Sequence, residues 1–169
     1  MSTQRGMVLL LSLLLTMLLG LLGLSSLHSA LLQERMSGNL LVSLQLLEQA
    51  ETTLRHAEAQ LQAGLELAPC RYCQPPPEAG NVQAPGIYRG AGRHSGLVWS
   101  ASASGLFLIQ RLGRSVHAAR MPVDEPVMLY RITAVARQGA ARTVLESTFA
   151  LTLAADGPPM QRILWRQVL

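Results

Sequence analysis

Residues 7–32 read MVLLLSLLLTMLLGLLGLSSLHSALL, and this stretch decides the fold class of the 169-residue chain. It contains no Asp, Glu, Lys or Arg, and 14 of its 26 residues are leucine. About 20 consecutive apolar residues cross the hydrocarbon core of a membrane as a helix, so the segment predicts a transmembrane helix. The remaining length suits one domain of ordinary size, which excludes a large multidomain enzyme.

A removable secretory signal is the alternative, because residues 26–30 (SLHSA) resemble a small-residue cleavage site. The apolar stretch exceeds the core of about 7–15 residues that such signals carry, and a helical pattern continues beyond it. We therefore expect the helix to be retained. Arg5 and the terminal amine precede it, while Glu34 and Arg35 cancel after it, which predicts a cytoplasmic amino terminus and an outer carboxy-terminal part.

Residues 33–63 predict an amphipathic continuation of the same helix. Leucines recur there at helical spacing, with charged and amide side chains on the other faces. These leucines are Leu40, Leu44, Leu47, Leu54 and Leu61. Gly64, followed by Pro69, predicts the end of the helix.

Residues 64–86 are rich in Pro, Gly and Ala and are interpreted as a connector, and residues 87–169 predict an antiparallel β domain. Turns are expected at residues 138–141 and 156–159. With a single preceding helix, the fold class is α+β, a long helix packed on a small antiparallel sheet. The expected strands are 97–99, 106–112, 127–137, 142–153 and 162–169.

Cys70 and Cys73 are the only cysteines. Outside the cytoplasm, the pair favours a disulfide that closes a very short loop. A redox motif normally opens a helix, whereas Pro75–Pro77 follows here. A structural zinc ion would need about two further Cys or His ligands. Both alternatives rank well below the disulfide.

The remaining residues that could carry chemistry indicate neither an enzyme nor a cofactor. The four histidines are scattered and have no metal-ligand spacing. Residues 90–96 lack the ending of a phosphate-binding loop. Asp124 and Glu125 fit an exposed turn better than a calcium site. All fourteen basic residues are Arg, the net charge is +4, and no basic run indicates nucleic-acid binding.

The first residues, MSTQRG followed by MVLL, resemble a type IV prepilin leader. That resemblance implies that residues 1–6 are a leader, cut between Gly6 and Met7 by a prepilin peptidase on the cytoplasmic side. The mature amino terminus would then be methylated. A glycine, which has no Cβ, allows extended backbone to enter a protease cleft at the bilayer surface.

Further segments resemble the PilX-type minor pilins of type IV pili. They are ERMSGNL (34–40), QAETTLRHAE (49–58), YRITA (130–134), VLESTF (144–149) and RILWR (162–166). The resemblance implies a pilin-like fold and a part in pilus assembly, in an initiation or tip complex. It implies as partners other minor pilins, the assembly platform and a tip adhesin. The location implied is the inner membrane, with the carboxy-terminal domain in the periplasm, and then the pilus tip.

The chain departs from most pilins at the fifth position of the mature sequence, where Leu11 replaces a glutamate. In pilins this carboxylate is understood to pair with a neighbouring subunit's amine, so its loss suits a subunit that begins the assembly. A pseudopilin of type II secretion is one alternative, although its tip subunit is generally much longer. A single-pass periplasmic binding or enzyme domain with an uncleaved anchor is another.

One face of the membrane segment carries small residues at helical spacing: Ser12, Thr16, Gly20 and Gly23. Small side chains let two helix backbones approach closely, and hydroxyl groups can bond across the contact. We expect this small-residue stripe to be a helix-packing interface.

Overall fold

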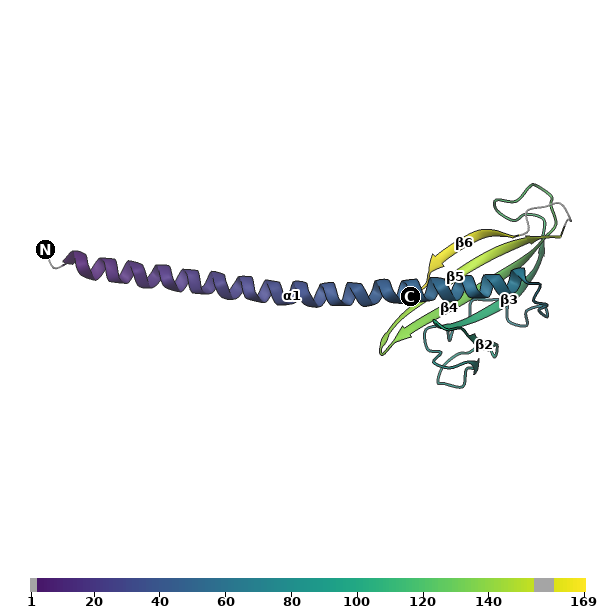
Figure 1. Cartoon of the computed structure of the whole chain (residues 1–169), viewed down its shortest axis with the longest axis horizontal. Helices are drawn as coiled ribbons and strands as arrows, with labels where there is room; N and C mark the ends of the chain where they lie inside the picture. Colours follow the sequence, from purple (N-terminus) through teal and green to yellow (C-terminus); the bar gives the residue numbers. More distant parts are fainter. Residues whose placement is uncertain (1–2, 154–159) are drawn as a thin grey trace. The chain divides into compact units, whose positions relative to one another are not determined.

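The computed structural model describes residues 3–153 and 160–169, so the turn expected at residues 156–159 lies outside the described part. One helix is followed by six strands, in agreement with the predicted α+β class (Figure 1). The elements are α1 (Thr3–Gln62), β1 (Gly86–Ile87), β2 (Val98–Ala101), β3 (Leu106–Ser115), β4 (Val127–Gln138), β5 (Ala141–Thr152) and β6 (Gln161–Gln167). The chain forms two compact units, Met1–Leu41 and Val42–Leu169.

The first unit consists of the apolar part of α1. An 18-residue window of this helix reaches a mean hydropathy of 2.6, and none of that window is buried against protein. Leucine side chains face outward all round the helix. Such a surface is unstable in water and suits a lipid environment, so α1 is long and apolar enough to cross a membrane.

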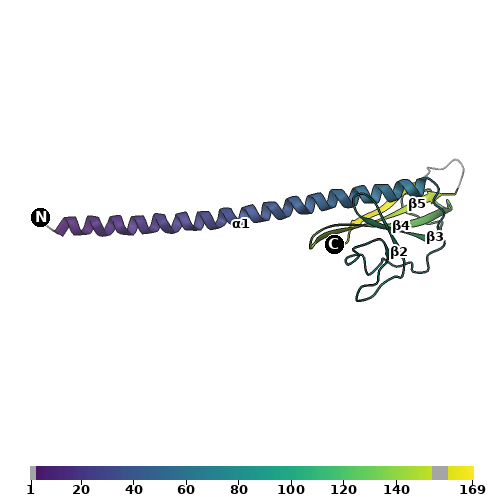
Figure 2. The ribbon, with the colours of Figure 1, turned by 60° about the horizontal axis from the view of Figure 1, so that its bottom comes forward.

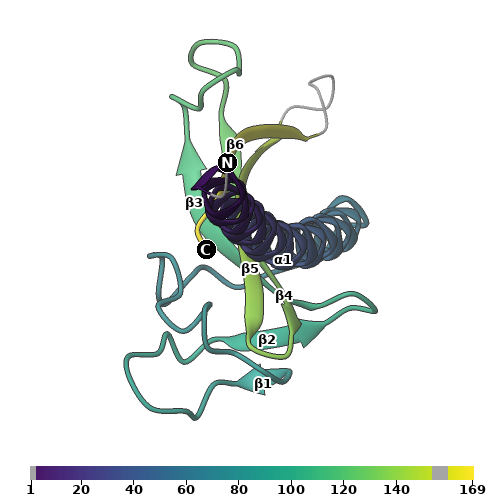
Figure 3. The ribbon, with the colours of Figure 1, turned by 90° about the vertical axis from the view of Figure 1, so that its left-hand side faces the viewer.

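The six strands of the second unit form one antiparallel sheet in which every strand pairs with its neighbours in sequence (Figure 3). The five predicted strands are confirmed to within three residues at each end, and the two-residue strand β1 was not predicted. The hairpin predicted at residues 138–141 joins β4 to β5, where Gln138 pairs with Ala141. Gly139 has φ +59°, the left-handed conformation that a two-residue hairpin loop requires.

The part of α1 that belongs to this unit lies along one face of the sheet (Figure 1). Leu54 and Leu61 of the predicted stripe are buried, whereas Leu44 is 53% exposed. Leu46, Ala50 and Ala57, which were not part of the predicted stripe, complete the contact at helical spacing. The buried helix residues are Leu46, Ala50, Thr53, Leu54, Ala57 and Leu61, and they face Phe107, Ile132, Ala134, Ala136, Leu145 and Phe149.

The opposite face of the sheet is covered by residues 70–97, on the side away from α1 (Figure 2). Ala79 and Val82 are buried there against Trp99, Val135 and Val144. The segment interpreted as a connector therefore forms a third layer of the domain. We call this side the connector face of the sheet, and the side that carries α1 the helix face.

The end of α1 follows the prediction. The helix ends at Gln62, and Gly64 has φ +86° while the Leu65 amide donates to the Gln60 carbonyl. A glycine in the left-handed conformation is a common helix termination. The chain then turns along the end of the helix face, where it forms one wall of a groove.

Candidate interaction surfaces

The predicted processing site lies in the helical first turns of α1, since Gly6 and Met7 both fall within Thr3–Gln62. Met7 is 74% exposed, whereas the side chains of residues 1–6 lie outside the described part. Leu11, which stands where most pilins carry a carboxylate, presents a 66% exposed apolar side chain. Nothing in this geometry tests the cleavage itself, which stays a prediction.

The small-residue stripe is open to a second helix. A Cβ added to Gly20 or Gly23 would meet nothing within 4 Å among the described residues. The hydroxyl of Ser12 donates to the Leu9 carbonyl at 2.9 Å, and that of Thr16 donates to the Leu13 carbonyl at 2.9 Å. Both hydroxyl protons are thus bonded within α1. The stripe would therefore let a second helix backbone come close, but it supplies no free hydroxyl proton from Ser12 or Thr16 to bond that helix.

Cys70 and Cys73 are joined in the structure as the sequence predicts, with their Cα atoms 5.3 Å apart. The short loop that they close is fastened to the connector face of the sheet. Gln110 donates to the carbonyls of Tyr72 at 2.6 Å and Gln74 at 3.0 Å, and Arg131 donates to the carbonyl of Cys73 at 2.8 Å. This loop is held by side chains of β3 and β4 as well as by its sulfur atoms.

Glu78 is fully buried under the connector face, which sequence reasoning did not anticipate. Its carboxylate accepts hydrogen bonds from the Ser95 amide at 2.9 Å, from the Ser95 hydroxyl, and from the Trp99 indole at 3.3 Å. A buried carboxylate is tolerated when such donors surround it. Glu78 therefore links the connector to the loop that contains Ser95 and to Trp99. The glycine-rich loop 90–96 has a structural role.

Glu146 is the second buried carboxylate, and it lies on the connector face of β5. Arg166 of β6 reaches it from Nη2 at 2.9 Å and Nε at 3.1 Å, and Arg131 of β4 lies 3.5 Å away. These contacts link three neighbouring strands. Two arginines share the one carboxylate, so the cluster carries one excess positive charge.

In the part of the chain that the structure describes, the side chains that could bind a metal ion are scattered. No group of three or more His, Cys, Asp and Glu side chains there could hold a metal ion. His56 approaches Gln60 at 3.1 Å and touches the Phe107 ring edge-on, with centroids 5.6 Å apart. Asp124 occupies a turn with φ +62°.

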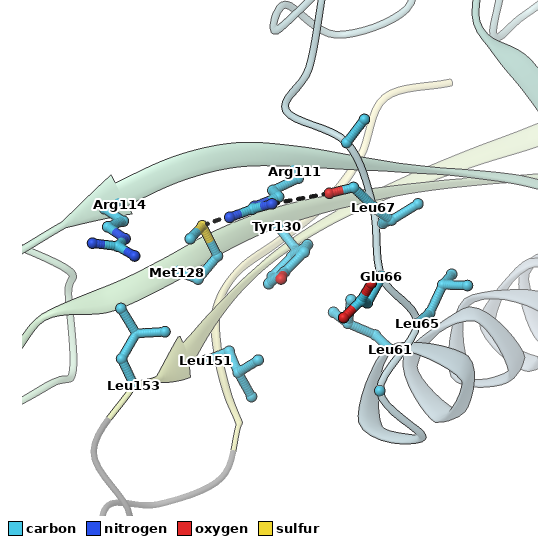
Figure 4. Close-up of a pocket in the computed structure, with 12 residues that line it drawn as sticks. Leu61, Leu65, Glu66, Leu67, Arg111, Arg114, Met128, Tyr130, Leu151 and Leu153 are labelled. Atoms are coloured by element: carbon cyan, nitrogen blue, oxygen red, sulfur yellow. Dashed lines mark hydrogen bonds between the residues drawn. The ribbon is translucent and has the colours of Figure 1, made fainter.

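A groove of about 630 Å³ lies where the helix face extends past the end of α1 (Figure 4). Its floor is formed by β3, β4 and β5, and residues 64–68 form one wall. Sequence reasoning missed this groove, although Gly113 inside a strand is a signal for a bulge at this place. The side chains that line it are Leu61, Leu65, Glu66, Leu67, Arg111, Arg114, Met128, Tyr130, Leu151 and Leu153.

Comparisons of the chain with protein-family models, with curated proteins and with solved structures found no match.

Proposed function

We propose that the chain is a minor pilin of the PilX type that takes part in type IV pilus assembly, in an initiation or tip complex. One observation carries the proposal: α1 (Thr3–Gln62) is a single helix whose two parts have surfaces suited to different surroundings. Its first part exposes leucines on all sides, and its last part buries a stripe on an antiparallel sheet. A subunit that is first held in a membrane and then packed in a filament needs both surfaces.

The amino-terminal sequence supports the same function. Arg5-Gly6 directly before the charge-free run resembles a prepilin leader, and Leu11 replaces the usual carboxylate. A carboxylate in lipid is costly unless it is paired. A subunit at the start of the assembly has no distal neighbour to supply a partner, so leucine suits that position. The partners implied are other minor pilins, the assembly platform, the prepilin peptidase and a tip adhesin.

The decisive experiment is mass spectrometry of the amino terminus of the protein purified from native membranes. We expect a mature chain that begins at Met7 with a methylated amine and retains the apolar helix. Gly6→Leu should leave full-length precursor and abolish pilus assembly, whereas Gly23→Leu, a matched change inside the helix, should be processed normally. An intact Met1 terminus would favour an uncleaved anchor, and a terminus near Leu31 would favour a secretory signal.

The alternative of a type II secretion pseudopilin rests on the same Leu11, because a tip pseudopilin also lacks the carboxylate. The two functions differ in what fails when the gene is deleted. Loss of surface pili with normal protein secretion supports the minor pilin, and the opposite phenotype supports the pseudopilin.

A further inference from the structure

The groove at the end of the helix face has a preformed apolar floor. Leu61, Met128 and Tyr130 are each less than 10% exposed, and Leu151 packs against them. At the rim, Leu65 (41% exposed) and Leu153 (46% exposed) add apolar surface beside the polar side chains of the lining. A volume of about 630 Å³ lies in the range of sites for small molecules.

A β-bulge places two arginines on the same face of β3, where both line this groove. Residues 111 and 114 of a regular strand would point to opposite faces. The register of β3 against β4 shifts between Arg111 and Gly113, so that Arg111 pairs with Tyr130 and Arg114 pairs with Met128. Tyr130 and Met128 share the helix face, and both arginines therefore do as well. Gly113 has φ +123°, a conformation that L side chains rarely adopt, so the bulge depends on glycine.

The guanidinium of Arg111 is held in position at the groove. It donates from Nη1 to the Leu67 carbonyl at 3.1 Å and from Nε to the Met128 sulfur at 3.4 Å (Figure 4). These two bonds use two of the five N–H donors that the planar group carries. Arg114 lies beside Met128 and Leu153 in the same view. Two guanidinium groups that line one groove are an arrangement that suits capture of an anion.

We propose that this groove binds an aliphatic carboxylate, with the acid group on Arg111 and Arg114 and the alkyl chain on the leucine and methionine floor. Two arginines and Glu66 give the lining one excess positive charge, which matches a monoanion better than a phosphate dianion. An alkyl chain also leaves no polar group unpaired on an apolar floor, whereas a peptide would bury backbone amides there. This inference does not depend on the pilin proposal.

The test uses the full chain reconstituted in phosphatidylcholine nanodiscs and titrated with octanoate by calorimetry, with empty nanodiscs as the blank. We expect one saturable site per chain and no such site for octanol, which lacks the charge. Arg114→Gln and Arg111→Gln should each weaken binding about tenfold, which is the effect of losing one charge-assisted hydrogen bond. Arg93→Gln, a matched change in an exposed loop, should leave the affinity unchanged.

Arg111 also supports the wall of the groove, so Arg114→Gln is the deciding variant if Arg111→Gln fails to fold. Octanoate uptake that equals the empty nanodiscs, or that is unchanged in Arg114→Gln, would overturn the proposal. Tighter binding of octyl phosphate would reassign the groove to phosphate esters. Tighter binding of acetyl-trileucine with a free carboxylate would reassign it to a peptide terminus.

Discussion

The two faces of the sheet are covered in different ways. The helix face is closed by an apolar stripe of α1, in which alanines and leucines alternate at helical spacing. The connector face is closed by an irregular segment that is tied down through buried polar groups, among them Glu78, Gln110 and Arg131. The helix face is held mainly by apolar packing. The connector face has apolar packing as well, but it also relies on individual hydrogen bonds to the backbone of the irregular segment.

Because of this difference, the hydrophobic periodicity of the sequence predicts the contacts of the helix face but not those of the connector face. A regular helix meets a regular sheet at repeated intervals, so hydrophobic burial is its main contact, to which the Glu58–Arg162 ion pair and the Thr53–Ser102 hydrogen bond add. An irregular segment has no repeated interval, and its backbone carbonyls need individual partners when they lie against a sheet. Arg137, which donates to the Val82 carbonyl at 3.1 Å, is one such partner.

The largest expected effect is on the helix face. Leu54 is completely buried between α1 and the sheet, so Leu54→Ala should lower the free energy of unfolding of the carboxy-terminal unit by about 2–5 kcal/mol. Denaturant titration followed by tryptophan fluorescence measures this change. Leu44→Ala, at an exposed position of the same helix, should cost under about 1 kcal/mol. Equal effects at the two positions would contradict the observed contact stripe.

A smaller effect is expected on the connector face from Glu78→Gln. The substitution keeps the shape of the side chain but removes the charge that strengthens the bonds from Ser95 and Trp99. We expect a loss of about 1.5–3 kcal/mol in the free energy of unfolding. The same change at the exposed Glu48 serves as the control. If Glu78→Gln were as stable as the parent, this carboxylate would not hold the connector.

Removal of the disulfide should have a still smaller effect. The closed loop is short, and Gln110 and Arg131 hold it in place without the sulfur atoms. Cys70→Ser combined with Cys73→Ser should therefore lower the free energy of unfolding by no more than about 2 kcal/mol. Alkylation of the non-reduced parent should label neither thiol. Unfolding of the domain on mild reduction would show that the loop depends on its covalent link.

The smallest effect on domain stability is expected in the first unit, outside both faces. Gly20→Leu combined with Gly23→Leu adds bulk to the small-residue stripe and should leave insertion, processing and the stability of the domain unchanged. If the chain acts as the minor pilin proposed above, the double variant should also disrupt co-purification with other minor pilins and reduce piliation, because backbones can no longer approach closely. Leu18→Phe combined with Leu22→Phe adds bulk away from the stripe and should leave co-purification intact. Normal pili in the glycine double variant would show that the stripe is not an interface.

The sequence predicted the parts of the fold that repeat. The apolar run, the helix end at Gly64 and the alternation in β4 and β5 indicated the helix and the main strands. The predicted helix stripe was correct at Leu54 and Leu61 but wrong at Leu44, and it missed Ala50 and Ala57 because leucines were weighted above alanines. The third layer and Glu78 could not be predicted, since their contacts join residues with no periodic relation. The arginine pair was missed because the bulge at Gly113 reverses the parity of the strand.

The order of the strands has a consequence for how the domain forms. Each strand pairs with the one before it in sequence, so most of the sheet is built from contacts of short sequence separation. Local contacts of this kind form quickly, because closing a short loop costs little chain entropy before the strand pairing stabilises it. The helix α1 differs, because Leu46 and Ala50 belong to the same core cluster as Leu145 and Phe149, which lie nearly a hundred residues later in the sequence. We therefore expect the hairpins to assemble first and the helix to dock last, so that folding passes through a stage with a finished sheet and an uncovered helix face.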